Sequence, residues 1–381
     1  MQTLKVGVVG AGMIGDHHAR LWAKVPGVTV AGIVEVDQAK ARAMADRLKI
    51  PAFGSLRELK RRTGAQVASL CVPSALHAKV GLEAVREGMH LFVGKPLDIN
   101  ISRAKELLRA ARSKGLRLAV SSQKRWAPGS LKIRELVAAG ALGRIFLVRA
   151  IVPWYRSQKY YDQGAGRGTY RSDGGGALII HAIHMVDLAL HLTGKEPIWA
   201  GASSGTFTHR IEVEDTLVGH LRMSDGTLGQ VLAGTSLYPG FADRVEIYGE
   251  KGTVHWEGGD LSFAMFNGGK VSDYGTFLTY GKIPFLKKFA DGLQVGILGP
   301  LREPWKFVRA RLKAVDWPLL GRSVSAFDES FLAQLRDAGE FFRTGKGSIV
   351  TGRSALRTLA VIEALYRSAR THREERVEPV R

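Results

Sequence analysis

A lysine at the end of an apolar run is the first candidate for chemistry in this 381-residue chain. Lys95 follows Phe92-Val93-Gly94 and precedes Pro96, which would hold the turn so that the ammonium points into a cleft. Burial or a nearby positive charge lowers the pKa of a lysine toward neutrality, so that its amine can take or return a hydroxyl proton. On spacing alone, an ordinary solvated lysine explains the residue equally well.

Two histidines three residues apart are the second candidate. His181 and His184 follow the triple glycine 174–176, and helical spacing predicts that they share one face with Asp187. A glycine run lets the chain pass close to a ligand or another backbone. Metal ligation and a purely structural role are the alternatives, but no third and fourth ligand with recognisable spacing follows. We therefore expect a proton-transfer site without a metal ion.

A glycine-rich turn near the N-terminus predicts a dinucleotide site. The apolar run Leu4–Val9 leads directly into a G-x-G-x-x-G that opens a helical stretch over residues 13–25. Its glycines permit the tight turn, the approach of a pyrophosphate and the packing of helix on strand. The residues expected at the cofactor are Gly10, Gly12, Met13, Ile14 and Gly15.

Glu35 indicates which dinucleotide binds. It stands twenty residues after Gly15, where a carboxylate accepts hydrogen bonds from the ribose hydroxyls and repels a 2′-phosphate. NAD is therefore favoured over NADP. The alternative is that Glu35 and Asp37 only cap the next helix, although Asp37 suits the N-cap position better.

Alternating strands and helices would position these residues in an α/β domain. Apolar runs of strand length alternate with amphipathic stretches from residue 4 to about 121. This order requires crossover connections and a parallel sheet, so residues 1–122 are predicted to form an NAD(P)-binding, doubly wound Rossmann domain. Ligands of such sheets lie beyond the carboxyl ends of the strands, where Lys95 is expected.

The pattern changes after residue 122. Strand-like runs at 144–152, 213–223, 227–233, 244–248 and 253–256 are joined by turn signals, with one long helix expected over 177–192. Two further helices are expected over 326–343 and 354–369. Residues 123–381 are therefore predicted to form an α+β domain with a large open, mainly antiparallel sheet.

Composition narrows the partners and the compartment. The net charge is +20, but the basic residues are dispersed and no nucleic-acid-binding motif is visible, so we expect no nucleic acid partner. The single cysteine, Cys71, lies in an apolar run and excludes an internal disulfide. No run of eighteen or more apolar residues appears, and a cytoplasmic location is expected.

A basic insert spans about residues 282–322. It carries nine lysines and arginines against three acidic residues, with aromatic residues among them. Such a segment can lie on an anionic membrane surface or guide a phosphorylated substrate. The interpretation that we prefer is a surface excursion or subunit contact with solvated charges.

With these residues assembled, the chain resembles the Gfo/Idh/MocA family, the group of glucose–fructose oxidoreductase and inositol dehydrogenase. The shared pieces run along nearly the whole chain in the family order. They are the glycine turn followed by His18, Pro73 with His77, Lys95-Pro96, Gln123-Lys124-Arg125 before Pro128, 140–144, Trp154-Tyr155-Arg156, Tyr160-Tyr161, Arg167-Gly168-Thr169, the triple glycine, Ile183-His184 and Asp187.

The resemblance implies a sugar, nucleotide sugar or cyclitol substrate, with Lys95 as the proton-transferring residue aided by His184. It also implies a homodimer or homotetramer formed through the C-terminal sheet. Further cofactor contacts are expected from Pro73, His77, Lys95, Pro96 and Gln123. Substrate contacts are expected from Arg125, Trp154, Arg156, Tyr160, Tyr161, Arg167 and His184. Arg156 and Arg167 suit a carboxylate or phosphate.

Two departures from the family pattern affect the same site. The glutamate that usually precedes the lysine is Gly94, and the polar residue four before the histidine is Ile180. We hypothesise that His181 supplies the missing polar contact. The main functional hypothesis is reversible oxidation of a secondary hydroxyl. Two alternative hypotheses are elimination of a glycosidic bond by transient oxidation without net redox change, and a non-catalytic dinucleotide sensor.

Overall fold

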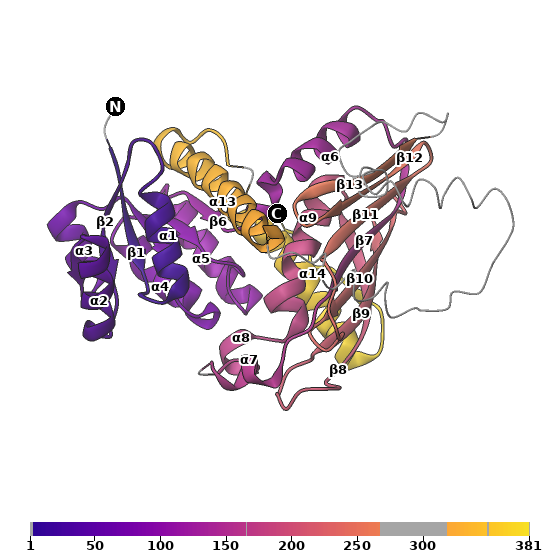
Figure 1. Ribbon diagram of the computed structural model, residues 1–381, viewed down its shortest axis with the longest axis horizontal. Coiled ribbons are helices and arrows are strands. Elements are labelled where there is room, and N and C mark those ends of the chain that lie inside the picture. The colour runs from indigo at the N-terminus through magenta and orange to yellow at the C-terminus, as the bar shows by residue number, and fades with distance from the viewer. Residues whose placement is uncertain (1–2, 165, 267–317, 349, 381) are drawn as a thin grey trace, which may run out of the picture.

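The computed structural model describes residues 3–164, 166–266, 318–348 and 350–380. Two lobes lie beside one another, and the long helix α13 (Pro318–Thr344) runs between them (Figure 1). Residues 282–317 of the basic insert lie outside the described residues, and 318–322 begin α13.

The first lobe is built on a six-stranded parallel sheet in the order β3-β2-β1-β4-β5-β6. Its strands are buried on both faces because helical crossovers connect them, which explains their continuous apolar sequences. The strands are β1 (Leu4–Val9), β2 (Val28–Val34), β3 (Ala52–Phe53), β4 (Val67–Leu70), β5 (His90–Val93) and β6 (Leu118–Val120). The helices are α1 (Met13–Trp22), α2 (Gln38–Leu48), α3 (Leu56–Thr63), α4 (His77–Arg86) and α5 (Ile101–Ser113), with a 3₁₀ turn at Ser74–Leu76.

The second lobe is built on an eight-stranded sheet in the order β13-β12-β11-β7-β10-β9-β8-β14, in which only β7 and β10 pair in parallel. Its strands are β7 (Ile145–Pro153), β8 (Pro197–Gly205), β9 (Thr216–Met223), β10 (Leu228–Gly234), β11 (Arg244–Gly249), β12 (Gly252–Glu257), β13 (Asp260–Phe266) and β14 (Glu375–Arg376). The helical segments are a 3₁₀ turn at Gln123–Trp126, α6 (Pro128–Ala138), α7 (Gln158–Asp162), α8 (Tyr170–Asp173), a π-helix (Leu178–Ala182), α9 (Ile183–Thr193) and α14 (Gly352–Thr371). Helices α9 and α14 lie on the side of the sheet that faces the first lobe (Figure 1).

These two sheets confirm the predicted fold class: a parallel Rossmann sheet followed by a large, mainly antiparallel one. The sequence pattern did not indicate β8, which carries a run of small residues, β13, or the two-residue strands β3 and β14. The single helix expected over 177–192 is a π-helix that continues into α9.

Helix α13 belongs by packing to the first lobe, although it lies near the C-terminus of the chain. Phe331 and Leu335 are buried in one apolar cluster with Trp22 and Phe92. Burial of each such side chain contributes about 1.5–3 kcal/mol. Gln334 adds two hydrogen bonds to the end of β6, accepting from the Ser122 N–H at 3.1 Å and donating to the Val120 carbonyl at 2.7 Å.

Among the residues that the structure describes, one helical stretch, Tyr170–Thr193, is long and apolar enough to cross a membrane by length and composition. Within the fold, 78% of its most apolar window is buried. A core helix of a folded domain passes the same test, and this stretch contains His181 and His184.

Candidate active site

The glycine turn after β1 has the shape of a dinucleotide cradle. Gly10 has φ +106°, a conformation that favours glycine, and a Cβ on Gly15 would lie 1.9 Å from the Gly10 carbonyl oxygen. A Cβ on Gly12 would meet nothing within 4 Å, so the space in front of its backbone is open. Met13 and Ile14 are 81% and 53% exposed beside this turn. These residues therefore fit a bound pyrophosphate at the start of α1.

Glu35 lies against the same turn. Its carboxylate accepts from the Ala11 N–H at 2.9 Å and from the Asp37 N–H at 3.1 Å. Asp37 caps α2 by accepting from the N–H groups of Ala39 and Lys40, as the sequence indicated. If the pyrophosphate binds at the glycine turn, the adenosine ribose of the dinucleotide would lie beside the Glu35 carboxylate.

Lys95 bridges the two lobes. It follows β5 at the carboxyl edge of the first sheet, and its half-buried ammonium donates to the carbonyl of Ile180 in the π-helix. Loss of solvation lowers the pKa of Lys95 to about 8, against an opposing effect of the Asp173 charge. At pH 7 roughly one molecule in ten then carries the free amine.

Both histidines lie within electrostatic reach of this lysine. Burial and then the positive charge of Lys95 lower the pKa values of both His181 and His184 well below the ordinary range, so both imidazoles are neutral near pH 7. Lys124 adds a third, weaker effect at His184. The π-helix that carries His181 is a local distortion of the kind often found at functional sites.

Asp173 is a residue of this site that our sequence reasoning did not assign. It ends α8, accepts from the Gly168 N–H at 2.7 Å and is close enough to raise the pKa of Lys95. Burial raises the pKa of Asp173, while the Gly168 N–H, Arg167 and Lys95 oppose that shift. Its position directly before the triple glycine was the available signal in the sequence.

Aromatic rings and guanidinium groups form a wall beside His181. The ring of Trp154 lies 5.3 Å from that of His181, and the ring of Tyr160 lies 6.0 Å from it. The Arg156 guanidinium lies 4.8 Å from the Trp154 ring, and that of Arg167 lies 4.2 Å from the Tyr160 ring. The structure thus brings four of the predicted substrate residues together with a predicted catalytic one.

Two other residues predicted to contact substrate lie inside the protein. The Tyr161 hydroxyl is hydrogen-bonded to that of Thr235 at 2.8 Å, and its ring packs on His209. Arg125 is only 3% exposed, and its Nε donates to Asp187 at 2.8 Å. Burial alone would raise the pKa of Asp187, but the guanidinium holds it below its ordinary value. Both side chains therefore contact buried residues of the second lobe, Thr235 and Asp187.

His77 ties two loops together. Its ring nitrogens lie 2.7 Å from the Pro96 carbonyl oxygen and 3.0 Å from that of Val72. A Cβ on Gly94 would lie 3.3 Å from this ring, so glycine leaves it room. Pro73, in contrast, is exposed at the turn that follows β4. His77 thus links the loop after β4 to the turn that carries Lys95.

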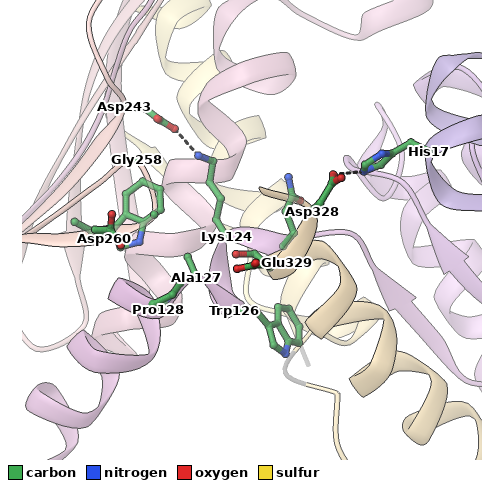
Figure 2. Close-up of a pocket in the computed structure, with 14 residues that line it drawn as sticks. His17, Lys124, Trp126, Ala127, Pro128, Asp243, Gly258, Asp260, Asp328 and Glu329 are labelled. Carbon is green, nitrogen blue, oxygen red and sulfur yellow. Dashed lines mark ion pairs between the residues drawn. The ribbon is translucent and has the colours of Figure 1, made fainter. Parts of the chain in front are cut away.

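Gln123 lies at the edge of a pocket between the lobes. Its side chain is 5% exposed, and its Oε1 has no hydrogen-bond partner among the described residues. The pocket has a volume of about 710 Å³, with Lys124 near its centre, ion-paired to Asp243 at 2.8 Å (Figure 2). His17 and Asp328 also line this pocket, with His17 Nε2 and Asp328 Oδ1 3.6 Å apart (Figure 2). A buried acceptor without a partner fits a bound amide or hydroxyl donor.

The described part of the chain holds no group of three or more histidine, cysteine or acidic side chains arranged around a metal ion. The polar groups near Lys95 are instead two imidazoles, one carboxylate and one backbone carbonyl. This set can hold and move a proton.

Comparison with known proteins gives consistent relatives. Residues 4–122 match the Gfo/Idh/MocA oxidoreductase family with an NAD-binding Rossmann fold, and residues 130–255 match the Gfo/Idh/MocA C-terminal domain. Myo-inositol dehydrogenase Hyg17 of Streptomyces leeuwenhoekii is 30% identical over 66% of this chain and 76% of its own length. The NADP-dependent scyllo-inositol 2-dehydrogenase IolW of Bacillus subtilis is 23% identical over 98% of this chain and 96% of its own.

Solved structures show the same arrangement of both lobes. The WlbA dehydrogenase from Bordetella pertussis, crystallised with NADH and UDP-GlcNAcA, has a TM-score of 0.79 and 25% identity, covering 99% of each chain. The two family matches, the relatives and the shared fold agree with the residues described above. The chain therefore belongs to the Gfo/Idh/MocA family of NAD-binding oxidoreductases.

Proposed function

We propose that this protein is an NAD-dependent dehydrogenase that reversibly oxidises a secondary hydroxyl of a sugar, nucleotide sugar or cyclitol. The observation that carries the proposal is the meeting of Lys95, from the first lobe, with the π-helix of the second lobe, which carries His181 and continues into α9, where His184 lies. Bound NAD would supply the hydride-accepting carbon. The relatives named above act on inositols, and the WlbA crystal contained a UDP-sugar acid.

The protein side chains would divide the work as follows. The free amine of Lys95 takes the hydroxyl proton during oxidation and returns it during reduction. His184, being neutral, can hydrogen-bond the same oxygen without adding positive charge beside the lysine. His181 supplies a second neutral contact in place of the polar side chain that Ile180 lacks.

The dinucleotide would be held by the glycine turn, Glu35 and Gln123, with Pro73 and Pro96 shaping the turns that follow β4 and β5. The carboxylate of Glu35 beside Ala11 supports NAD over NADP, because a 2′-phosphate there would meet a like charge. His77 would act through Pro96 and Val72, whose carbonyls it contacts.

The wall of Trp154, Tyr160, Arg156 and Arg167 supports a substrate with an anionic group, since guanidinium groups offer paired donors to carboxylate or phosphate. Arg125 and Tyr161 would position this wall and α9 from inside the lobe. We place an acidic or nucleotide-linked sugar ahead of a neutral one.

We further propose assembly through the open face of the second sheet. Along β9, Leu217 and Leu221 are buried, and alternation places Val218 on the opposite face, where it is 49% exposed; Leu228 of β10 is 56% exposed. Light scattering of the purified protein should give the mass of a dimer or tetramer; a monomer at micromolar concentration would contradict this proposal.

The activity itself is tested with a panel of cyclitols, free sugars, uronic acids and nucleotide sugars, each with NAD and NADP, by following reduced-nicotinamide absorbance. Formation of NADH with at least one hydroxylated substrate is the expected result. Release of a free sugar from glycosides without NADH accumulation would assign elimination instead. Tight NAD binding with no conversion across the panel would favour a sensor.

A further inference from the structure

Glu214 contacts the start of the π-helix that carries His181 and leads into α9 with His184, and it is not among the groups that act on Lys95. It precedes β9 and is 5% exposed. Its Oε2 accepts from the Gly176 N–H at 2.8 Å, its Oε1 accepts from the Leu178 N–H at 2.9 Å, and its backbone carbonyl accepts from the Ala177 N–H at 3.0 Å. One residue thus satisfies three successive N–H groups at a helix start, which have no partner within the helix.

Tyr366 of α14 extends this arrangement by one residue. Its hydroxyl donates to Glu214 Oε1 at 2.8 Å and accepts from the Ile179 N–H at 3.3 Å. Burial raises the pKa of Tyr366 well above its ordinary value, so the hydroxyl stays a donor. The N–H groups of residues 176–179 therefore all donate to Glu214 or Tyr366, which come from separate parts of the chain.

The same two residues explain two of the three glycines, Gly175 and Gly176. A Cβ on Gly175 would lie 2.2 Å from the Tyr366 hydroxyl oxygen, and a Cβ on Gly176 would lie 1.8 Å from the Glu214 carbonyl oxygen. The glycines let the backbone approach these two partners closely. At these two positions glycine serves packing within the protein and not the approach of a ligand.

The residue that follows the anchored stretch is Ile180, whose carbonyl accepts from Lys95. The turn is a π-helix: the Ile183 N–H bonds to the Leu178 carbonyl, five residues back. A change in its first N–H contacts would move the Ile180 carbonyl and the two imidazoles together.

We propose that Glu214 and Tyr366 are positioning residues that hold the π-helix Leu178–Ala182 so that the Ile180 carbonyl, His181 and His184 face Lys95. This inference rests on the proposed function of Lys95. On this inference, the buried carboxylate of Glu214 and the Tyr366 hydroxyl of α14 determine which groups of the second lobe surround Lys95 of the first.

The test compares Tyr366→Phe and Glu214→Gln with Tyr248→Phe. Tyr248 is a matched control, because its hydroxyl also donates to a glutamate, Glu246 at 2.9 Å, on the sheet away from this turn. Two measurements need no substrate: hydrogen exchange of residues 176–184, and competitive acetylation of Lys95 with acetic anhydride as a function of pH, read by peptide mass spectrometry.

In the two variants we expect exchange at 176–182 to speed up at least tenfold and the labelling pKa of Lys95 to move up from the wild-type value, because water reaches a loosened site. The control should match wild type in both measurements. With any substrate that the wild type oxidises, kcat should fall about tenfold or more while NAD binding changes less than twofold.

Folded variants with wild-type exchange and wild-type Lys95 labelling would overturn the inference, even if their melting temperature is lower. If Glu214→Gln does not fold, Tyr366→Phe, which removes one oxygen, decides alone. A Lys95→Met enzyme that keeps full turnover would instead sink the proposed function, and the exchange result would still report on the anchoring.

Discussion

The ammonium of Lys95, which follows a strand of the first lobe, donates a hydrogen bond to the backbone carbonyl of Ile180 in the second. The Ile180 side chain is apolar, so this contact is made by its main-chain carbonyl. Loss of solvation at this position lowers the pKa of Lys95 to about 8.

The pH dependence of oxidation should report Lys95 and its neighbour Asp173. Because the free amine is the base, kcat should rise with pH to a plateau, with an apparent pKa of about 8. The Asp173 charge raises that pKa, so Asp173→Asn should move the rising limb to lower pH. Steady-state kinetics from pH 6 to 10 measure this. Asp162→Asn, on the exposed neighbouring helix α7, is the control. If the rising limb of the pH profile does not move in Asp173→Asn, or moves to higher pH, the assignment of Lys95 as the titrating base is contradicted.

Glu35 should set the preference for NAD. Glu35→Gln removes the charge while keeping the side-chain length, so NAD should bind about tenfold more weakly, as expected for loss of a charged hydrogen-bond acceptor, and NADP more tightly. Fluorescence titration with NADH and NADPH gives both dissociation constants. Asp37→Asn is the matched control, since asparagine caps a helix as well as aspartate does. An unchanged ratio of the two constants in Glu35→Gln would show that the carboxylate does not face the ribose.

Arg156 should discriminate between charged and neutral substrates. Its guanidinium lies over Trp154 and 5.6 Å from the Tyr160 ring, where a carboxylate or phosphate could pair with it. Arg156→Gln should raise KM for an anionic sugar about tenfold, equivalent to 1.4 kcal/mol. KM for a neutral cyclitol should change less than twofold. Arg144→Gln, at a surface pair with Glu250, controls for the lost charge; equal effects on both substrate types would argue against an anion site.

His181 should matter for turnover if it replaces the polar side chain missing at Ile180. His181→Ala is expected to lower kcat by roughly tenfold to a hundredfold, within the range of an oriented proton-transfer contact, without weakening NAD binding. Initial rates and NADH titration on the same preparation measure both effects. Unchanged turnover would leave His181 as a packing partner of Trp154 only.

The Arg125–Asp187 pair should be a stability element. Both side chains are almost fully buried, and Thr358 also donates to Asp187 at 2.9 Å. Asp187→Asn leaves an uncompensated buried guanidinium and should lower the free energy of unfolding by about 3–5 kcal/mol. Denaturant unfolding followed by circular dichroism measures it. A loss below 1 kcal/mol would mean that water or another group compensates Arg125.

Much of the fold could be predicted because its signals are local. The apolar runs, the glycine turn and the twenty-residue spacing to Glu35 lie within short stretches of sequence, and each is governed by backbone geometry. The packing of α13 on Trp22 and Phe92 could not be predicted, because more than two hundred residues separate these partners. The same holds for Gln334 at the end of β6.

The site divides in the same way. Lys95, His181 and His184 were recognisable from residue type and neighbours, but the direction in which a side chain points depends on distant contacts. Arg125 and Tyr161 turn inward because Asp187 and Thr235 are buried beside them. Glu214 and Tyr366 carried no signal of their own, since their roles exist only where three chain segments meet.

The most direct measurement is the oxidation rate of Lys95→Met beside that of the wild type, at equal NAD saturation, on the best substrate of the panel. NADH binding to the variant is titrated first, to show that the cradle at Gly10–Gly15 is intact. We predict a loss of turnover of roughly 10²- to 10⁴-fold with a dissociation constant for NADH within threefold of wild type. A variant that binds NADH normally and turns over at the wild-type rate would contradict the assignment of Lys95 as the proton-transferring residue.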